Sequence, residues 1–176
     1  MKRLLSLLLA TSALTAIADG NNLYVGAGAG LGWNDIQAPD AAFRVDGGVN
    51  FTDNWAMEIG TTGLTQSGST PNQSMQYYDL SVKGTLPLSE AFGLFLQLGG
   101  AYGSPGATAD NAVVVGSTVD SYNQSQQAGW NFLTAAGLQF NLTHQVSLNL
   151  TDYYYYGATN PQGNTNVLLG GVKFNF

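Results

Sequence analysis

The 176-residue sequence has no cysteine, few charged residues and no long hydrophobic run beyond its N-terminus. The lack of cysteine excludes a small secreted fold held by disulfides and an enzyme with a thiol nucleophile. Charged residues make up 9% of the chain, whereas soluble globular domains carry about 25%. A membrane-spanning helix needs roughly 20 consecutive apolar residues, and no such stretch follows residue 18. The length suits one domain.

The N-terminus has the order of features of a secretory signal peptide. Lys2 and Arg3 form a basic start, residues 4–17 are mostly apolar, and Ala16-Ile17-Ala18 is an A-x-A cleavage site. We therefore predict a cleaved signal peptide at residues 1–18 and one mature domain at residues 19–176. The alternative is a buried amphipathic helix. The sequence has no cysteine after the apolar segment, which excludes lipoprotein processing.

The mature chain is strongly acidic. It keeps three basic residues, Arg44, Lys83 and Lys173, against eleven acidic ones, a net charge of −8. Nucleic-acid binding needs a basic patch that neutralises phosphates. The sequence therefore excludes nucleic acid as a partner.

Large apolar residues alternate with small or polar ones in eight successive segments, which is the pattern of β-strands. Short polar turns at 52–54, 87–91 and 141–145 alternate with longer connections at 34–42, 65–75, 103–127 and 157–165. Short turns on one side and longer loops on the other are typical of an outer-membrane barrel. We predict an all-β fold, an eight-stranded antiparallel up-and-down transmembrane β-barrel with both termini on the periplasmic side. The expected strands lie at 23–33, 43–51, 55–60, 78–86, 92–99, 129–140, 146–151 and 168–176.

The distribution of charge between the two faces distinguishes a membrane barrel from a soluble one. A soluble barrel has an apolar interior and a charged exterior, and a transmembrane barrel has the reverse. All clear strand charges alternate with the large apolar residues, so we expect them in the lumen as a buried ion-pair network. Inward glycines of the first segment would make room for these side chains, or would only relieve crowding in a tightly curved sheet. The predicted network comprises Arg44, Asp46, Glu58, Asp79, Lys83 and Lys173, and the glycines are Gly26, Gly28, Gly30 and Gly32.

Aromatic residues recur at both ends of the apolar face, where a membrane barrel has its interfacial girdles. The alternative is that aromatic residues gather at strand ends in any sheet. Simple alternation also turns Asp152 toward lipid, so that either Asp152 lies at headgroup level or a β-bulge shifts the register between Asp152 and Tyr156. The expected girdles contain Trp33, Trp55, Tyr78, Phe92, Tyr102, Trp130 and Phe140.

Two segments resemble those of known barrel proteins. The C-terminal residues Gly171, Phe174 and Phe176 resemble the signal by which outer-membrane barrels are recognised by their assembly machinery, although Leu169 departs from that pattern. The segment FRVDGGVNFTDNWAMEI, at 43–59, is similar to the second and third strands of OmpA-like and porin-family small barrels, the OmpX and OmpW types among them. The resemblance implies export through the periplasm, insertion by the assembly machinery and residence in outer-membrane lipid.

The function that we expect is structural. Eight strands enclose a lumen just wide enough for side chains to fill, so we predict a plugged, monomeric barrel that presents surface loops. The alternative is a narrow porin-like channel for small solutes. Loop residues 113–115, three valines, are either a partner site or a strand extension; the extracellular partner is not identified.

Catalysis is not expected. His144, the single histidine, falls in a short turn, and Ser89 and Ser147 would lie far from the outer leaflet, where lipid-modifying barrel enzymes work. We predict neither a metal site nor a cofactor site. The sequence has no cysteine and a single histidine, and it shows no cluster of catalytic or metal-ligating residues.

Overall fold

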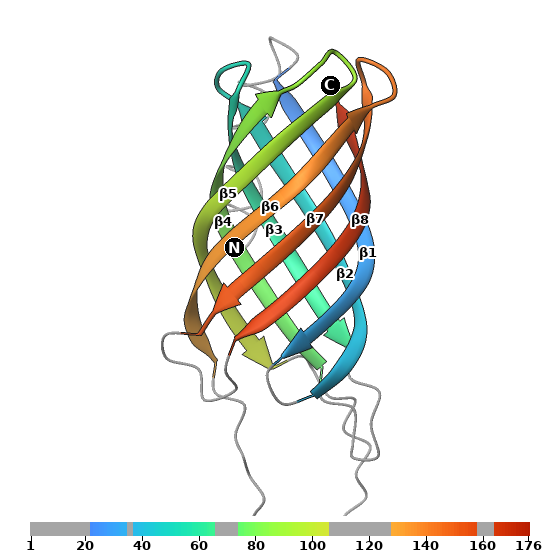
Figure 1. Cartoon of the computed structure of the whole chain (residues 1–176). Helices are drawn as coiled ribbons and strands as arrows, with labels where there is room; N and C mark the ends of the chain where they lie inside the picture. Colours follow the sequence, from blue (N-terminus) through green and yellow to red (C-terminus); the bar gives the residue numbers. More distant parts are fainter. Residues whose placement is uncertain (1–21, 35–36, 66–73, 106–127, 158–163) are drawn as a thin grey trace, which may run out of the picture.

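The computed structural model describes residues 22–34, 37–65, 74–105, 128–157 and 164–176. Each strand pairs with its sequence neighbours in antiparallel fashion, and the last strand pairs with the first, so that the sheet closes on itself (Figure 1). This confirms the predicted fold class. The strands are β1 (Leu23–Asn34), β2 (Gln37–Asn50), β3 (Trp55–Thr65), β4 (Ser74–Pro87), β5 (Phe92–Pro105), β6 (Gly129–Asn141), β7 (Val146–Tyr156) and β8 (Thr165–Asn175).

Within these ranges, no helix is long and apolar enough to cross a membrane.

The long-loop ends of several strands reach beyond the ranges expected from the sequence. The connection expected at 34–42 is wrong, because β2 begins at Gln37, which pairs with Asn34 of β1 across an irregularity in register. β3, β4 and β5 are also longer than expected. Hydrogen bonding between neighbouring strands continues as long as both strands have backbone N–H and C=O groups free to pair. The predicted signal peptide at residues 1–18 and the three valines at 113–115 lie outside the described residues.

The three short turns share one local design. In each, two consecutive backbone amides donate to the carbonyl of the residue that begins the next strand, as Leu88 and Ser89 do to Phe92 at 2.9 Å. A hydroxyl at the second turn position also accepts from backbone amides: Thr52 from Trp55 at 3.0 Å, Ser89 from Phe92 at 3.1 Å and Thr143 from Val146 at 3.0 Å. Ser and Thr form such side-chain turns readily, so these positions define the rim opposite the long loops.

The barrel wall separates two kinds of side chain. Large apolar residues point outward along every strand; Ile59 and Leu96, for example, are 66% and 67% exposed. The intervening positions are buried in the lumen, and many are polar or charged. This is the inverted arrangement of a transmembrane barrel, in which lipid replaces water at the outer wall.

Candidate functional site: the filled lumen

The six charged residues that the sequence places in the lumen all lie there. None is more than 9% exposed, and they come from four strands, β2, β3, β4 and β8, where each alternates with outward apolar neighbours.

Arg44 of β2 is the centre of this group. Its Nη1 and Nη2 donate to the two carboxylate oxygens of Asp79 at 2.6 and 2.8 Å, which is the paired geometry that a planar guanidinium favours. Nη2 also lies 3.2 Å from Glu58 Oε1, and Nε lies 3.6 Å from Asp46 Oδ1. The ring of Tyr153 covers the guanidinium, with its centroid 4.5 Å from Cζ. One cation therefore holds three carboxylates of β2, β3 and β4 together.

Glu58 extends the contacts to two further strands. Its Oε2 accepts from the hydroxyl of Tyr24 in β1 at 2.8 Å, and its Oε1 accepts from Gln97 Nε2 in β5 at 2.8 Å. Gln97 also donates to Ser81 Oγ at 2.6 Å. Buried polar groups are stable only when they are hydrogen-bonded, so this set of bonds allows charged side chains to fill the barrel's cross-section.

The two lysines depart from the prediction. Among the described residues, neither ammonium has a carboxylate within 4.0 Å, so the expectation of one network of all six charges is wrong for Lys83 and Lys173. Their Nζ atoms instead lie over aromatic rings, Lys83 at 3.8 Å from the Phe95 centroid and Lys173 at 3.9 Å from that of Tyr24. The physical reason is that the guanidinium, with its several donors, already engages all three carboxylates.

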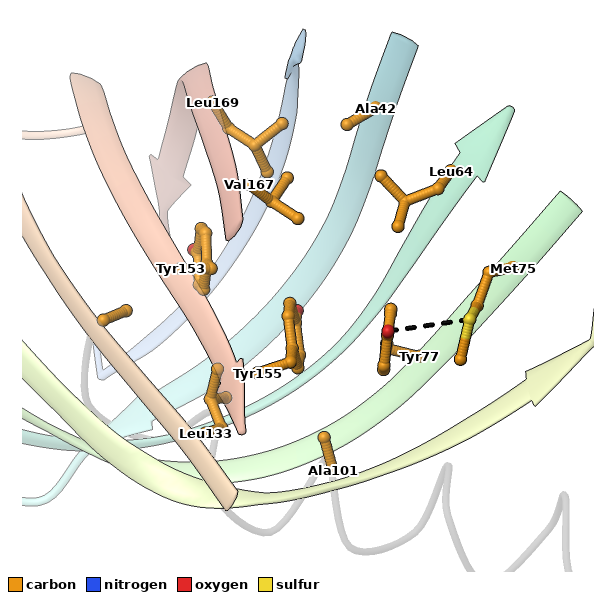
Figure 2. Packing of buried hydrophobic residues seen from close by; sticks show 11 residues of the cluster. Ala42, Leu64, Met75, Tyr77, Ala101, Leu133, Tyr153, Tyr155, Val167 and Leu169 are labelled. Carbon is orange, nitrogen blue, oxygen red and sulfur yellow. Dashed lines mark hydrogen bonds between the residues drawn. The ribbon is translucent and has the colours of Figure 1, made fainter. Parts of the chain in front are cut away.

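Toward the long loops the lumen changes character and becomes apolar (Figure 2). Tyr77 and Tyr155 stack with centroids 4.2 Å apart, and their hydroxyls bond to Thr165 and Thr62, each at 2.9 Å. The lumen is therefore not polar throughout, and the predicted charges and glycines fill only part of it. Strict alternation does place these side chains inward, so the sequence pattern contains a signal for the cluster. The cluster consists of Ala42, Leu64, Met75, Tyr77, Ala101, Leu133, Ala135, Tyr153, Tyr155, Val167 and Leu169.

The inward glycines of β1 serve both purposes that the sequence allowed. A Cβ on Gly26 would strike the carboxylate of Asp46, so this glycine makes room for a charged side chain. A Cβ on Gly30 would instead strike the backbone of β8 at Leu168, so this glycine permits the close approach of two strands. Outside β1, Gly60 gives the guanidinium of Arg44 its space.

The residues assigned to the girdles and to the C-terminal motif face outward or lie at strand ends. Trp55 and Phe140 lie at the short-turn end, whereas Tyr102 and Trp130 meet edge-to-face at the long-loop end with centroids 5.4 Å apart. Phe174 and Phe176 are exposed on the outer wall, and Gly171 alternates with them. The register from Asp152 to Tyr156 runs without a bulge, and Asp152 is exposed on the outer wall opposite Ala136 and Leu168.

Comparison with solved structures supports the fold. The chain is similar to Neisserial surface protein A, with 15% identity, a TM-score of 0.64 and coverage of 88% of this chain and 96% of that one. The N-terminal β-barrel domain of Pseudomonas aeruginosa OprF has 15% identity, a TM-score of 0.62 and coverage of 89% and 98%. The outer membrane enzyme PagL has 11% identity, a TM-score of 0.54 and coverage of 88% and 99%.

No curated protein matches the sequence. The model of the outer membrane protein β-barrel domain, however, matches residues 4–176. That match spans nearly the whole chain and agrees with the closed eight-stranded barrel and its apolar outer wall. The chain belongs to the family of outer membrane protein β-barrel domains.

Proposed function

We propose that the protein is a structural, non-enzymatic barrel of the bacterial outer membrane that holds its surface loops on a rigid, plugged wall. The filled lumen carries the proposal. Arg44 and its three carboxylates occupy the middle of the barrel, and the tyrosine-rich cluster occupies the half toward the long loops. Rigid side-chain packing in both layers suits an anchor better than a solute path.

Other parts of the proposal rest on the sequence and the outer wall. Export would proceed through the periplasm, and the assembly machinery would recognise Gly171, Phe174 and Phe176. The monomeric barrel would contact lipid through its apolar wall. The positions of His144, exposed in a short turn, and Ser147, buried in the lumen, support the non-enzymatic assignment.

Conductance tests the plugged lumen against the channel alternative. In planar bilayers, purified protein is expected to give no stable current steps, because ions would have to displace the salt bridges of Arg44. A porin reconstituted in the same bilayers is the control for insertion. Stable channels of uniform size would overturn the plugged assignment and favour a narrow diffusion channel.

Labelling of single cysteines tests the orientation. The sequence has no cysteine, so any introduced thiol is unique. With Ser117→Cys in the connection between β5 and β6, a membrane-impermeant maleimide is expected to react on intact cells. Ser89→Cys, in a short turn, is the matched control and is expected to react only after the cells are lysed. Equal labelling of both variants on intact cells, or the reverse order, would contradict the proposed presentation of the loops.

A further inference from the structure

A polar cavity of about 450 Å³ opens at the short-turn end of the lumen. Its lining includes Lys83 and Lys173, together with amide side chains such as Asn22, Asn50 and Gln139. The cavity lies on the opposite side of the Arg44 network from the apolar cluster, because Lys83 and Lys173 follow Asp79 and Leu169 toward the short-turn ends of β4 and β8. It is therefore a separate site from the packed middle of the barrel.

The two lysines are buried cations without an adjacent anion. Each is 3% exposed, and in the described part of the chain neither forms an ion pair. An aromatic ring covers one side of each ammonium, and a ring can accept only part of what three N–H donors offer. A buried charge is costly unless it is paired and hydrogen-bonded, so the remaining donors need an acceptor, which water or an anion in the adjoining cavity can supply.

Charge is separated along the lumen. Asp46, Glu58 and Asp79 are all drawn to Arg44, although Asp46 and Glu58 still act electrostatically on Lys83. The side chains of Lys83 and Lys173 lie within hydrogen-bonding reach of each other, so that their like charges repel. Asp53, which is exposed in the short turn between β2 and β3, also lines the cavity and is the carboxylate among its lining residues. A small anion in the cavity, beside the two lysine amino groups, would thus meet the positive end of the lumen.

We propose that this cavity binds a small oxyanion of the phosphate class beside the adjacent amino groups of Lys83 and Lys173, which both line it. Lysine is a common point-charge ligand of phosphate. The amide N–H₂ groups of Asn22 and Asn50 would add neutral donors that orient the oxygens. The same chemistry would accept either free phosphate or the phosphate of a lipid headgroup.

Lysine-selective NMR tests the proposal directly. The full sequence has three lysines, and only Lys83 and Lys173 belong to the barrel domain. In a sample with isotopically labelled lysine in detergent micelles, inorganic phosphate at constant ionic strength is expected to shift both barrel ammonium signals with one saturating curve. Sodium chloride at equal ionic strength is the control. Equal shifts in chloride, or no saturating shift in phosphate, would overturn the proposal.

Variants assign the effect to the two residues. Lys83→Met and Lys173→Met are each expected to weaken phosphate binding about tenfold or more, because each removes a charged hydrogen-bond donor. Both should fold, since each removes a buried cation that has no ion-pair partner. Asp53→Asn is the opposite control and is expected to tighten binding. Unchanged affinity in both lysine variants would overturn the proposal even if wild-type protein binds phosphate.

The source of the anion is decided by reconstitution. In nanodiscs of phosphatidylglycerol without added phosphate, shifted lysine signals would support the site with a lipid headgroup as its ligand. Shifts that appear only when inorganic phosphate is added would support it with the free ion.

Discussion

Arg44→Met is expected to lower the free energy of unfolding by about 3–5 kcal/mol, the cost of leaving buried charges without their partner. The side chain is 2% exposed and is the cation nearest to all three lumen carboxylates. Methionine fills similar space without charge or donors. Asp79 would lose both of its short hydrogen bonds, and Glu58 would keep only those from Tyr24 and Gln97.

Urea unfolding of the reconstituted barrel, followed by tryptophan fluorescence, measures this change. Arg44→Lys is the graded control, because it keeps the charge but cannot form the forked pair with Asp79, and a smaller loss is expected. In the double variant Arg44→Met/Asp79→Asn, part of the stability should return, since one orphaned carboxylate is gone. If the unfolding midpoint of Arg44→Met equals that of the wild type, Arg44 does not organise the lumen.

Gly30→Ala is expected to destabilise the barrel by about 1–3 kcal/mol or more, because it overpacks the seam where the sheet closes. Gly30 pairs with Leu169 between β1 and β8. A Cβ at this position would lie 2.9 Å from the carbonyl carbon of Leu168, 3.0 Å from the Cα of Leu169 and closer still to the Leu168 oxygen. All three are backbone atoms, so the strands themselves would have to separate.

Gly170→Ala is the matched control from the same seam. Gly170 pairs with Ala29, directly beside Gly30, but faces outward, and a Cβ there would have no atom within 4 Å. Its unfolding free energy should therefore stay within about 0.5 kcal/mol of the wild type. Both variants can be compared by urea unfolding and by the mobility of the folded barrel in gels. A loss of stability in Gly170→Ala as large as that in Gly30→Ala would refute the steric explanation.

Much of the fold follows from local patterns. Residues such as Val45 and Leu80 lie outward and Arg44 and Asp79 inward because the period of a strand is two, and eight such segments with alternating short and long connections suffice for an up-and-down barrel. Strand ends were predicted less well. β2 begins as early as Gln37 because Asn34 of β1 is there to pair with it. The sequence of β2 alone does not contain this information.

The sequence alone does not predict which of the lumen charges form ion pairs. Alternation places Arg44, Lys83 and Lys173 in the lumen. The position of each residue along the barrel axis then decides which of them contacts a carboxylate. In the closed barrel Arg44 of β2 reaches Asp79 of β4 across the intervening strand β3, while the lysines come to lie over Phe95 and Tyr24. Barrel closure also brings inward tyrosines of β4 and β7 into one stack.

The low charge of the sequence by itself determined the surroundings of the protein, since a wall without Lys and Glu on its outer face is suited to lipid and not to water. Strand alternation also predicts that the six clear strand charges lie inside, whereas Asp152 faces outward. The tertiary structure alone decided how they are used: one arginine binds the carboxylates, and two buried lysines line a polar cavity. The reason is that alternation fixes only the face of a residue, whereas barrel closure and shear fix its neighbours.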